Sequence, residues 1–444
     1  MNASDNSLST GKRGSVLIIV MLICMGLVAL TLYFASSMSA ELRASDNRAA
    51  DTSAREAAAG GMRYASYVLK NFSLGGVMPD PTADYQAAAL PVGDASFWFI
   101  GRDPNQIATT DPVFALVDES SKLNLNTANS AMLQALPGMT PDLAQAIIDW
   151  RSPSGSSGAA SGTYAALNPP RLNKSAPFES VDELRLVNGA TLDLLLGEDT
   201  NRNGAIDANE DDGPQSPPAD NQDAILQPGL WEYVTIYSKQ PNTRPDGSQR
   251  INITVPQLRD GLSALLQRRL NAARAAAIMA RIGTSNFASV AEFMLAAGFT
   301  ADEFQKVHTD ITASTGATAN GLVNVNTASA TVLACIPGIG TNNATAIVAY
   351  RLAHLTSLTS LAWVAQVLTR TDLLRAGPYI TDQSYQFSAD IAAVGPFGRG
   401  YDREKVVFDT STETPRIIYH ENLNAYGWAL GATVRQSLKT PKET

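Results

Sequence analysis

The sequence predicts an α+β protein in which a long N-terminal transmembrane helix packs on a small antiparallel sheet, with a large helical domain inserted into that sheet. Three observations support this prediction. An uncharged apolar run covers residues 15–34, a repeated helical pattern occupies much of residues 118–380, and segments with strand character lie before and after that block. Because the strand-like segments flank the helical block, the block is predicted to be an insertion between parts of one sheet.

Composition limits the function classes. The 444 residues are 45% hydrophobic, which is enough for two to four domains at roughly 100–200 residues each. A net charge of −9 disfavours a dedicated nucleic-acid-binding protein. Cys24 and Cys335 are too isolated to form a disulfide framework, and His308, His354 and His420 lie too far apart for a histidine-rich zinc site. No GxSxG, HExxH, paired CxxC or P-loop motif is present, so we expect no enzymatic activity.

The apolar run at the N-terminus is long enough to span a membrane. Its 20 residues, 15–34, match the length needed to cross about 30 Å of hydrocarbon. The short segment before it is polar and ends in Lys12-Arg13-Gly14. Positive charges on a short flank keep that side in the cytoplasm, so the bulk of the chain is predicted to be exported.

Three interpretations compete for this segment. A secretory signal could be cleaved after Ala40, although the apolar run is longer than usual and Met38 is unfavourable at the −3 position. An uncleaved anchor with a helical stalk is the second possibility. The third is a prepilin-type signal, cut on the cytoplasmic side between Gly14 and Ser15.

The sequence after the apolar run favours the third interpretation. Residues 40–72 are rich in alanine and charged residues, and no proline occurs before Pro79. The segment therefore continues the span into one helical rod of roughly 50 residues, with a bend expected at Gly60-Gly61. Such a rod behind a Lys-Arg-Gly cut resembles the N-terminal helix of type IV pilins and pseudopilins.

An internal repeat dominates the central block. Residues 123–151 and 323–351 align without a gap at an offset of 200, and residues 251–281 form a degenerate copy without the Pro-Gly turn. Each copy predicts a first helix capped by Thr or Asn (Thr327 in the last copy), a tight turn, and an apolar second helix ending in arginine. Amphipathic segments follow at residues 178–190, 287–300 and 358–368.

These units resemble helix-hairpin-helix (SAM-like) repeats, which bind DNA through the backbone of the turn. The local charges disfavour that role here. Residues 118–151 carry a net charge of −2 and residues 323–351 a net charge of +1, while the basic middle copy has no phosphate-binding turn. We therefore expect no nucleic-acid partner. A membrane-anchored helix-hairpin-helix protein that binds or takes up DNA remains the alternative.

Residues 199–210, DTNRNGAIDANE, fit the twelve-position calcium-loop template. Gly204 stands at position 6, where the template requires a sharp bend. Prolines after the loop exclude an exiting helix, so we expect a structural calcium ion instead of a sensor. The predicted ligands at positions 1, 3, 5, 7, 9 and 12 are Asp199, Asn201, Asn203, the Ala205 carbonyl, Asp207 and Glu210.

Strand character is confined mostly to the flanks of the helical block. β-branched and aromatic residues bounded by turn residues predict strands over six segments, namely 95–100, 112–119, 231–238, 384–394, 404–409 and 415–420. We expect the resulting sheet to bury the apolar stripe of the exported half of the N-terminal helix.

The order of these parts resembles the GspK family of minor pseudopilins of type II secretion systems. The likeness rests on the leader and helix, DESSKLNLNTA, IIDWR, FESVDEL, YVTIYS and the closing strands. It includes Ile19, where most pilins carry glutamate. The implied divisions are a prepilin leader, a transmembrane and pilin-like helix, the first part of the sheet domain, the inserted helical domain and the closing strands, at residues 1–14, 15–70, 71–117, 118–380 and 381–444.

The resemblance also carries functional expectations. It implies a structural subunit at or near the tip of a pseudopilus, cleaved and methylated by prepilin peptidase, which supports protein export across the outer membrane. It implies a single-pass location in the inner membrane with the bulk of the chain in the periplasm. The expected partners are other minor pseudopilins, and the expected cofactor is calcium.

Overall fold

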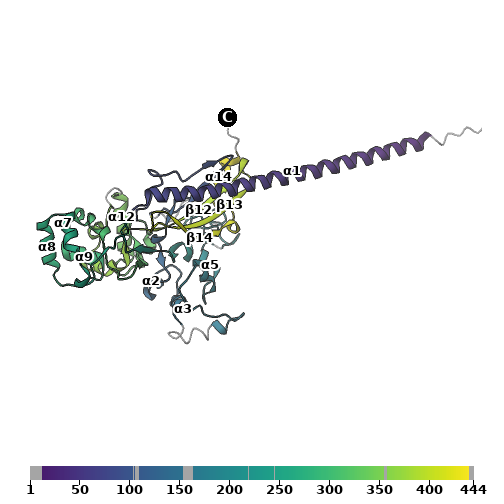
Figure 1. The fold of residues 1–444 in the computed structure, drawn as a ribbon. Coiled ribbons are helices and arrows are strands. Elements are labelled where there is room, and N and C mark those ends of the chain that lie inside the picture. Colours follow the sequence, from purple (N-terminus) through teal and green to yellow (C-terminus); the bar gives the residue numbers. More distant parts are fainter. Residues whose placement is uncertain are drawn as a thin grey trace, which may run out of the picture.

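The computed structural model describes residues 13–103, 105, 110–153, 164–218, 220–244, 246–354 and 358–439. Helix α1 (Arg13–Phe72) extends far beyond the body of the molecule (Figure 1). Val16–Phe72 is long and apolar enough to cross a membrane, and none of its most apolar stretch is buried by the described part of the chain. Residues 1–12 of the predicted leader lie outside the described part, as do the side chains at the predicted cleavage site, Gly14 and Ser15.

Helix α1 is continuous through Gly60-Gly61, so the predicted bend there is wrong. The two glycines serve a different purpose. A Cβ on Gly61 would lie 2.8 Å from Cγ2 of Ile391, and one on Gly60 would lie 3.1 Å from Cγ2 of Val92. Glycine at these positions therefore lets the helix backbone approach the sheet closely, which outweighs its low helix propensity.

The main sheet is antiparallel, and its strands come from both sides of the inserted block, as predicted. Its order is β1-β2-β12-β13-β14, and β3 also pairs with β12. Helix α1 packs on β2, β12 and β13, and the shared core contains Phe99, Phe387 and Phe408, which are almost fully buried. The strands are β1 (Leu90–Val92), β2 (Ala95–Ile100), β3 (Val117–Asp118), β12 (Gln386–Val394), β13 (Tyr401–Asp409) and β14 (Arg416–Asn422).

Two predicted strands are largely wrong. Within residues 112–119 only β3 forms, apart from an isolated bridge between Phe114 and Ile100, and the chain then enters η1 (Glu119–Ser121). Within residues 231–238 the first part is helix α6 (Leu230–Tyr233), and only β5 (Val234–Thr235) is extended. A short apolar run does not distinguish a buried helical turn from a strand, and here the helical core takes it.

The inserted domain consists of three repeat units that share one continuous core. In the first unit the elements before α6 and β5 are β4 (Leu123–Asn124), α2 (Ser130–Gln134), α3 (Pro141–Arg151), η2 (Val181–Leu186) and α5 (Leu192–Leu196). The second comprises β7 (Ile251–Asn252), η3 (Pro256–Leu258), α7 (Leu262–Arg269), α8 (Ala272–Ile282), α9 (Val290–Ala297), α10 (Ala301–Gln305), η4 (His308–Asp310) and β8 (Ile311–Thr312).

The third unit repeats this order and confirms that the degenerate middle copy is a full member. It comprises β10 (Val323–Asn324), α11 (Ala330–Ala334), α12 (Gly340–Ala353), η5 (Leu361–Gln366), α13 (Arg370–Ala376), η6 (Gly377–Tyr379) and β11 (Ile380–Thr381). Strands β6 (Lys239–Pro241) and β9 (Thr318–Asn320) pair between units. The chain closes with η7 (Pro396–Gly398), η8 (Asn424–Tyr426) and α14 (Gly431–Lys439).

Each unit is closed by a parallel pair of two-residue strands, which the sequence analysis missed. Strand β4 pairs with β5, β7 with β8, and β10 with β11. In every pair an asparagine on the first strand lies opposite a threonine on the second, at Asn124–Thr235, Asn252–Thr312 and Asn324–Thr381. The sequence signal for the second strand of each pair is therefore a Val-Thr or Ile-Thr dipeptide that recurs late in each copy.

Thr327 does not cap helix α11, contrary to the prediction. Ser329 is the cap, and its side chain accepts a hydrogen bond from the N–H of Val332. The hydroxyl of Thr327 instead donates to Asp118 over 2.5 Å. The chain cannot enter the helix at Thr327 because Asn324 Oδ1 first accepts the N–H of Asn326, which holds a turn before the helix.

Candidate metal-binding loop and its contacts with the sheet

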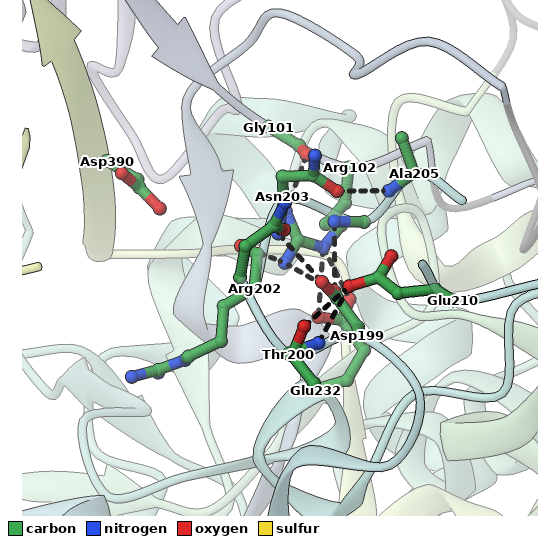
Figure 2. Close-up of polar contacts among 12 residues, drawn as sticks. Gly101, Arg102, Asp199, Thr200, Arg202, Asn203, Ala205, Glu210, Glu232 and Asp390 are labelled. Carbon is green, nitrogen blue, oxygen red and sulfur yellow. Dashed lines mark hydrogen bonds and ion pairs between the residues drawn. The ribbon is translucent and has the colours of Figure 1, made fainter. Parts of the chain in front are cut away.

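The predicted calcium loop begins two residues after Gly197, the C-terminal cap of helix α5. Among the described residues of the segment that follows, no helix forms before α6 starts at Leu230, as the proline-rich sequence predicts. The loop therefore has a short entering helix and no exiting helix. It lies where the first repeat unit meets the main sheet (Figure 2).

The backbone of the loop has the sharp bend that the template requires. Gly204 at position 6 has φ of +74°. The carboxylate of Asp199 accepts hydrogen bonds from the N–H groups of Asn203 and Gly204, each over 2.9 Å. The first ligand position thus folds the following residues around itself, and glycine supplies the positive φ at low cost.

Glu210 returns to the start of the loop. Its Oε1 accepts bonds from the N–H and the hydroxyl of Thr200, both over 2.9 Å, and its Oε2 accepts the N–H of Asp207 over 3.1 Å. Positions 1 and 12 are therefore brought together in one buried cluster, since Asp199 and Glu210 are 3% and 1% exposed.

The two asparagines lie between these ends. The amide nitrogens of Asn201 and Asn203 donate to Oδ2 of Asp207 over 2.6 and 3.0 Å. Their amide oxygens accept the N–H groups of Asn203 and Ala205 over 3.0 and 2.7 Å. All six predicted ligand residues thus lie in one folded loop, but these two amides would have to turn their oxygens toward a bound cation.

Buried negative charge is the main electrostatic property of the loop. Burial raises the pKa of Asp199, although Arg102 opposes that shift. Burial and the neighbouring Asp199 raise the pKa of Glu210 to about 7. Across the described part of the chain, no three His, Cys, Asp or Glu side chains converge closely enough to hold a metal by themselves. The amide and peptide oxygens complete a donor set that fits a hard cation such as calcium.

Arg102, which follows strand β2, contacts the loop from the sheet side. Its Nε lies 2.9 Å from both carboxylate oxygens of Glu232, and its Nη2 donates to the carbonyl of Arg202 over 3.1 Å. The same Nη2 lies 3.8 Å from Oδ2 of Asp199. A Cβ on Gly204 would lie only 2.7 Å from Nε of Arg102, so position 6 needs glycine for space as well as for conformation.

A second arginine holds the loop from strand β13. Arg403 is fully buried and pairs with Asp390 of strand β12, over 2.8 Å from Nε and 2.6 Å from Nη2. Its remaining N–H groups donate to the carbonyls of Asn201 and Arg202 over 2.5 and 2.9 Å. The sequence analysis missed this pair. The signal was Asp390 inside the largely apolar strand β12, where a charge needs a partner.

Arg202 at position 4 attaches the loop by its side chain. Its guanidinium carbon lies 4.9 Å from the ring centroid of Trp231 and 5.3 Å from that of Tyr426. Its Nη1 lies 3.9 Å from Glu421 of strand β14. The loop is therefore tied to both the helical domain and the closing part of the sheet.

A separate polar cluster joins the helical domain to the sheet at Asp118 and Glu119. Oδ2 of Asp118 accepts bonds from Asn324, Thr327 and Ser384 over 3.0, 2.5 and 2.5 Å. The third repeat unit and the main sheet therefore meet at one carboxylate. Burial raises the pKa of Asp118, and its hydrogen bonds only partly offset that shift.

Glu119 is paired with lysines of the chain itself. Its Oε2 accepts the hydroxyl of Thr235 over 2.5 Å, and its Oε1 lies 3.8 Å from Lys122 and 4.0 Å from Lys405. Burial acts to raise the pKa of Glu119, but the two lysines outweigh it and lower the pKa to about 2. Burial and the charge of Lys122 lower the pKa of Lys405 to about 8.

The hairpin turns are covered by later helices of their own units. A Cβ on Gly138 would lie 2.7 Å from Leu194 of α5, and one on Gly338 would lie 2.5 Å from the carbonyl oxygen of Asp372 in α13. Arg351, which ends the third hairpin, is buried and donates to the carbonyls of Val325 and Ala328. These features serve the packing of each unit and leave the turns poorly placed for a phosphate backbone.

Comparison with known proteins adds independent findings. Residues 113–196 match the family described as type II secretion system (T2SS), protein K, and residues 318–367 match the helix-hairpin-helix motif. A chain of the GspK-GspI-GspJ complex from the enterotoxigenic Escherichia coli type 2 secretion system is similar with a TM-score of 0.34 and 11% identity. That similarity covers 87% of this chain and 98% of that chain. The comparison with curated proteins gives no match.

The family match covers the strand β3 region and the first repeat unit up to helix α5. It includes three of the segments on which the sequence resemblance rests, DESSKLNLNTA, IIDWR and FESVDEL. The chain therefore carries the domain of the type II secretion protein K family, which confirms the predicted resemblance to the GspK minor pseudopilins.

Proposed function

We propose that this chain is a structural minor pseudopilin of a type II secretion system, which lies at or near the pseudopilus tip and supports protein export across the outer membrane. The observation that carries the proposal is the placement of the matched segment. Residues 113–196 begin the domain inserted into a sheet on which the second half of an otherwise free apolar helix packs. A helix with one half in the membrane and the other half against a sheet is the arrangement that a pilin-like subunit needs.

The width of the inserted domain supports the proposed position at the tip. The inserted domain is much wider than α1, and the second repeat unit lies at the end of the body farthest from the free half of that helix (Figure 1). A subunit of this width does not fit within a shaft of closely packed helices. Ile19 agrees with the proposal, because a subunit with none above it has no amine to neutralise there.

Prepilin peptidase, the inner membrane and other minor pseudopilins are the proposed partners. The proposal requires cleavage between Gly14 and Ser15. The test is the N-terminal sequence and intact mass of the protein recovered from its native membranes. A start at Ser15 with one added methyl group supports processing. A start at Met1 would contradict it, and a start at Glu41 would indicate a released exported protein.

We also propose that residues 199–210 bind one structural calcium ion. The supporting observation is that the buried Asp199 and Glu210 and the half-buried Asp207 lie on one loop whose bend at Gly204 follows the template. Bound calcium would supply positive charge to these carboxylates. The direct test is the thermal midpoint of the full-length protein in calcium and in chelator, where an unchanged midpoint with no calcium bound would reject the site.

DNA binding is not favoured as a second function. The helix-hairpin-helix match falls on the third unit, where helix α13 covers the turn at Gly338. Its terminal arginine, Arg351, is buried against the start of the same unit.

A further inference from the structure

We infer that Arg102 is a built-in counter-charge of the calcium loop, which lowers the affinity of the loop for calcium and stabilises the loop when calcium is absent. This inference rests on the proposed calcium site and concerns a residue outside the twelve positions of the template. It assigns a role in tuning metal affinity to a side chain contributed by the sheet domain.

The first step is the position of the guanidinium. Nη2 of Arg102 lies 3.8 Å from Oδ2 of Asp199, the residue at position 1 (Figure 2). The guanidinium also packs directly against Gly204. An ion held by Asp199 would therefore lie beside a permanent positive charge. At such short range the repulsion between Arg102 and a bound calcium ion would raise the dissociation constant for calcium about tenfold or more, even with strong dielectric screening.

The second step is the fixed orientation of this arginine. Four hydrogen bonds hold it, two to Glu232, one to the carbonyl of Gly101 and one to the carbonyl of Arg202. A guanidinium group keeps its positive charge at any pH at which a protein is folded. The charge is thus both permanent and held in place, and it cannot swing away when an ion enters.

The third step is the role of Glu232. This carboxylate of helix α6 binds Nε of Arg102, while Nη2 of the same side chain lies near Asp199, so Arg102 is shared between Glu232 and Asp199. Neutralising Glu232 would leave the full charge of Arg102 to act on the loop. Removing Arg102 and neutralising Glu232 should therefore change calcium affinity in opposite directions.

The experiment measures calcium binding to the full-length protein in detergent, after stripping with chelator, by competition with a fluorescent calcium indicator. Arg102→Met should bind calcium about tenfold more tightly than the wild type, and Glu232→Gln several-fold more weakly. Arg399→Met is the matched control for net charge, because Arg399 is half exposed and, among the described residues, forms its ion pair with the exposed Asp46. Its affinity should equal that of the wild type.

In chelator, Arg102→Met should also lower the thermal midpoint, because Asp199 then loses its nearest cation. Equal or weaker calcium binding by a folded Arg102→Met protein would overturn the inference. If that variant does not fold, unchanged or tighter binding by Glu232→Gln would overturn it. Absence of calcium binding by the wild type would reject the proposed site itself, and that result is distinct from either variant outcome.

Discussion

Two groups of polar contacts, here called joints, connect the helical domain to the sheet. They differ in the source of the positive charge that balances their carboxylates. At the Asp118–Glu119 joint, the chain supplies hydroxyl and amide donors together with Lys122 and Lys405. At the 199–210 loop, which carries three carboxylates, the cation beside Asp199 is Arg102, and this arginine already binds Glu232. The first joint draws its cations from the chain itself, whereas the proposed calcium ion would supply positive charge to the second. The proposal therefore separates a permanent connection from one that would depend on calcium.

The largest effect on stability is expected at the permanent joint, which is formed by Asp118 and Glu119. Asp118→Ala removes a carboxylate that is 3% exposed, takes the acceptor from the hydroxyls of Thr327 and Ser384, and leaves the amide of Asn324 with the Ser384 hydroxyl alone. We expect a loss of about 4 kcal/mol in the free energy of unfolding. Denaturant unfolding of the full-length protein in detergent measures it. The loss should be the same in calcium and in chelator, and a loss seen only in calcium would contradict the comparison.

The next largest effect on stability is expected at the joint formed by the 199–210 loop. The double variant Asp199→Asn with Glu210→Gln keeps the shape of the loop but removes two of its three carboxylate charges. At a calcium concentration 100-fold above the dissociation constant, the lost binding costs about 3 kcal/mol of stability. In chelator the variant should be no less stable than the wild type, because two buried charges are gone. Equal losses in both conditions would reject the metal site.

The pH dependence of the permanent joint gives a smaller effect. The pKa of Glu119 is lowered to about 2, from 4.5 for an unperturbed glutamate. A depressed carboxylate pKa contributes stability that is present above the unfolded value and lost as the pH falls through the folded value. Glu119→Gln should therefore cost about 2 kcal/mol at pH 7. Its difference from the wild type should shrink between pH 4.5 and 2, and a constant difference would contradict the assigned cause.

Periodicity and repeats in the sequence were enough to predict the main architecture. The apolar run, the flanking strands and the offset of 200 predicted a long helix, an antiparallel sheet and an inserted repeat domain, and the structure confirms all three. The errors came from contacts between distant segments. Gly60-Gly61 has the local properties of a bend, but the approach of the sheet decides its role.

The candidate loop shows the same division between local and distant information. Its six ligand positions are contiguous in sequence, so the template alone located them. Arg102 follows strand β2, and Asp390 and Arg403 lie in strands β12 and β13. All three are far from residues 199–210 in the sequence, and no local pattern connects them with the loop. A charged residue inside an apolar strand shows that a partner is needed, but the identity of that partner depends on the fold.

The smallest expected effect uses the internal repeat as its own control. Thr235 and Thr381 occupy equivalent positions in the first and third units. The hydroxyl of Thr235 donates to the Glu119 carboxylate over 2.5 Å, whereas that of Thr381 donates to the neutral Gln240 over 3.1 Å. Each hydroxyl also accepts one backbone N–H, from Tyr237 or Gln383. Replacing either threonine by valine keeps the shape and removes both bonds.

Because hydrogen bonds to charged groups are the stronger class, Thr235→Val should cost about 1 kcal/mol more than Thr381→Val. Denaturant unfolding of the two variants measures this difference, and calcium should not alter it, since neither threonine lies in the 199–210 loop. Equal costs would show that the hydroxyl adds nothing to the charge of Glu119 beyond what its lysines provide. In that case Glu119 would be stabilised by Lys122 and Lys405 alone. This half of the permanent joint would then resemble the 199–210 loop, because it would rely on cations instead of on hydrogen-bond donors.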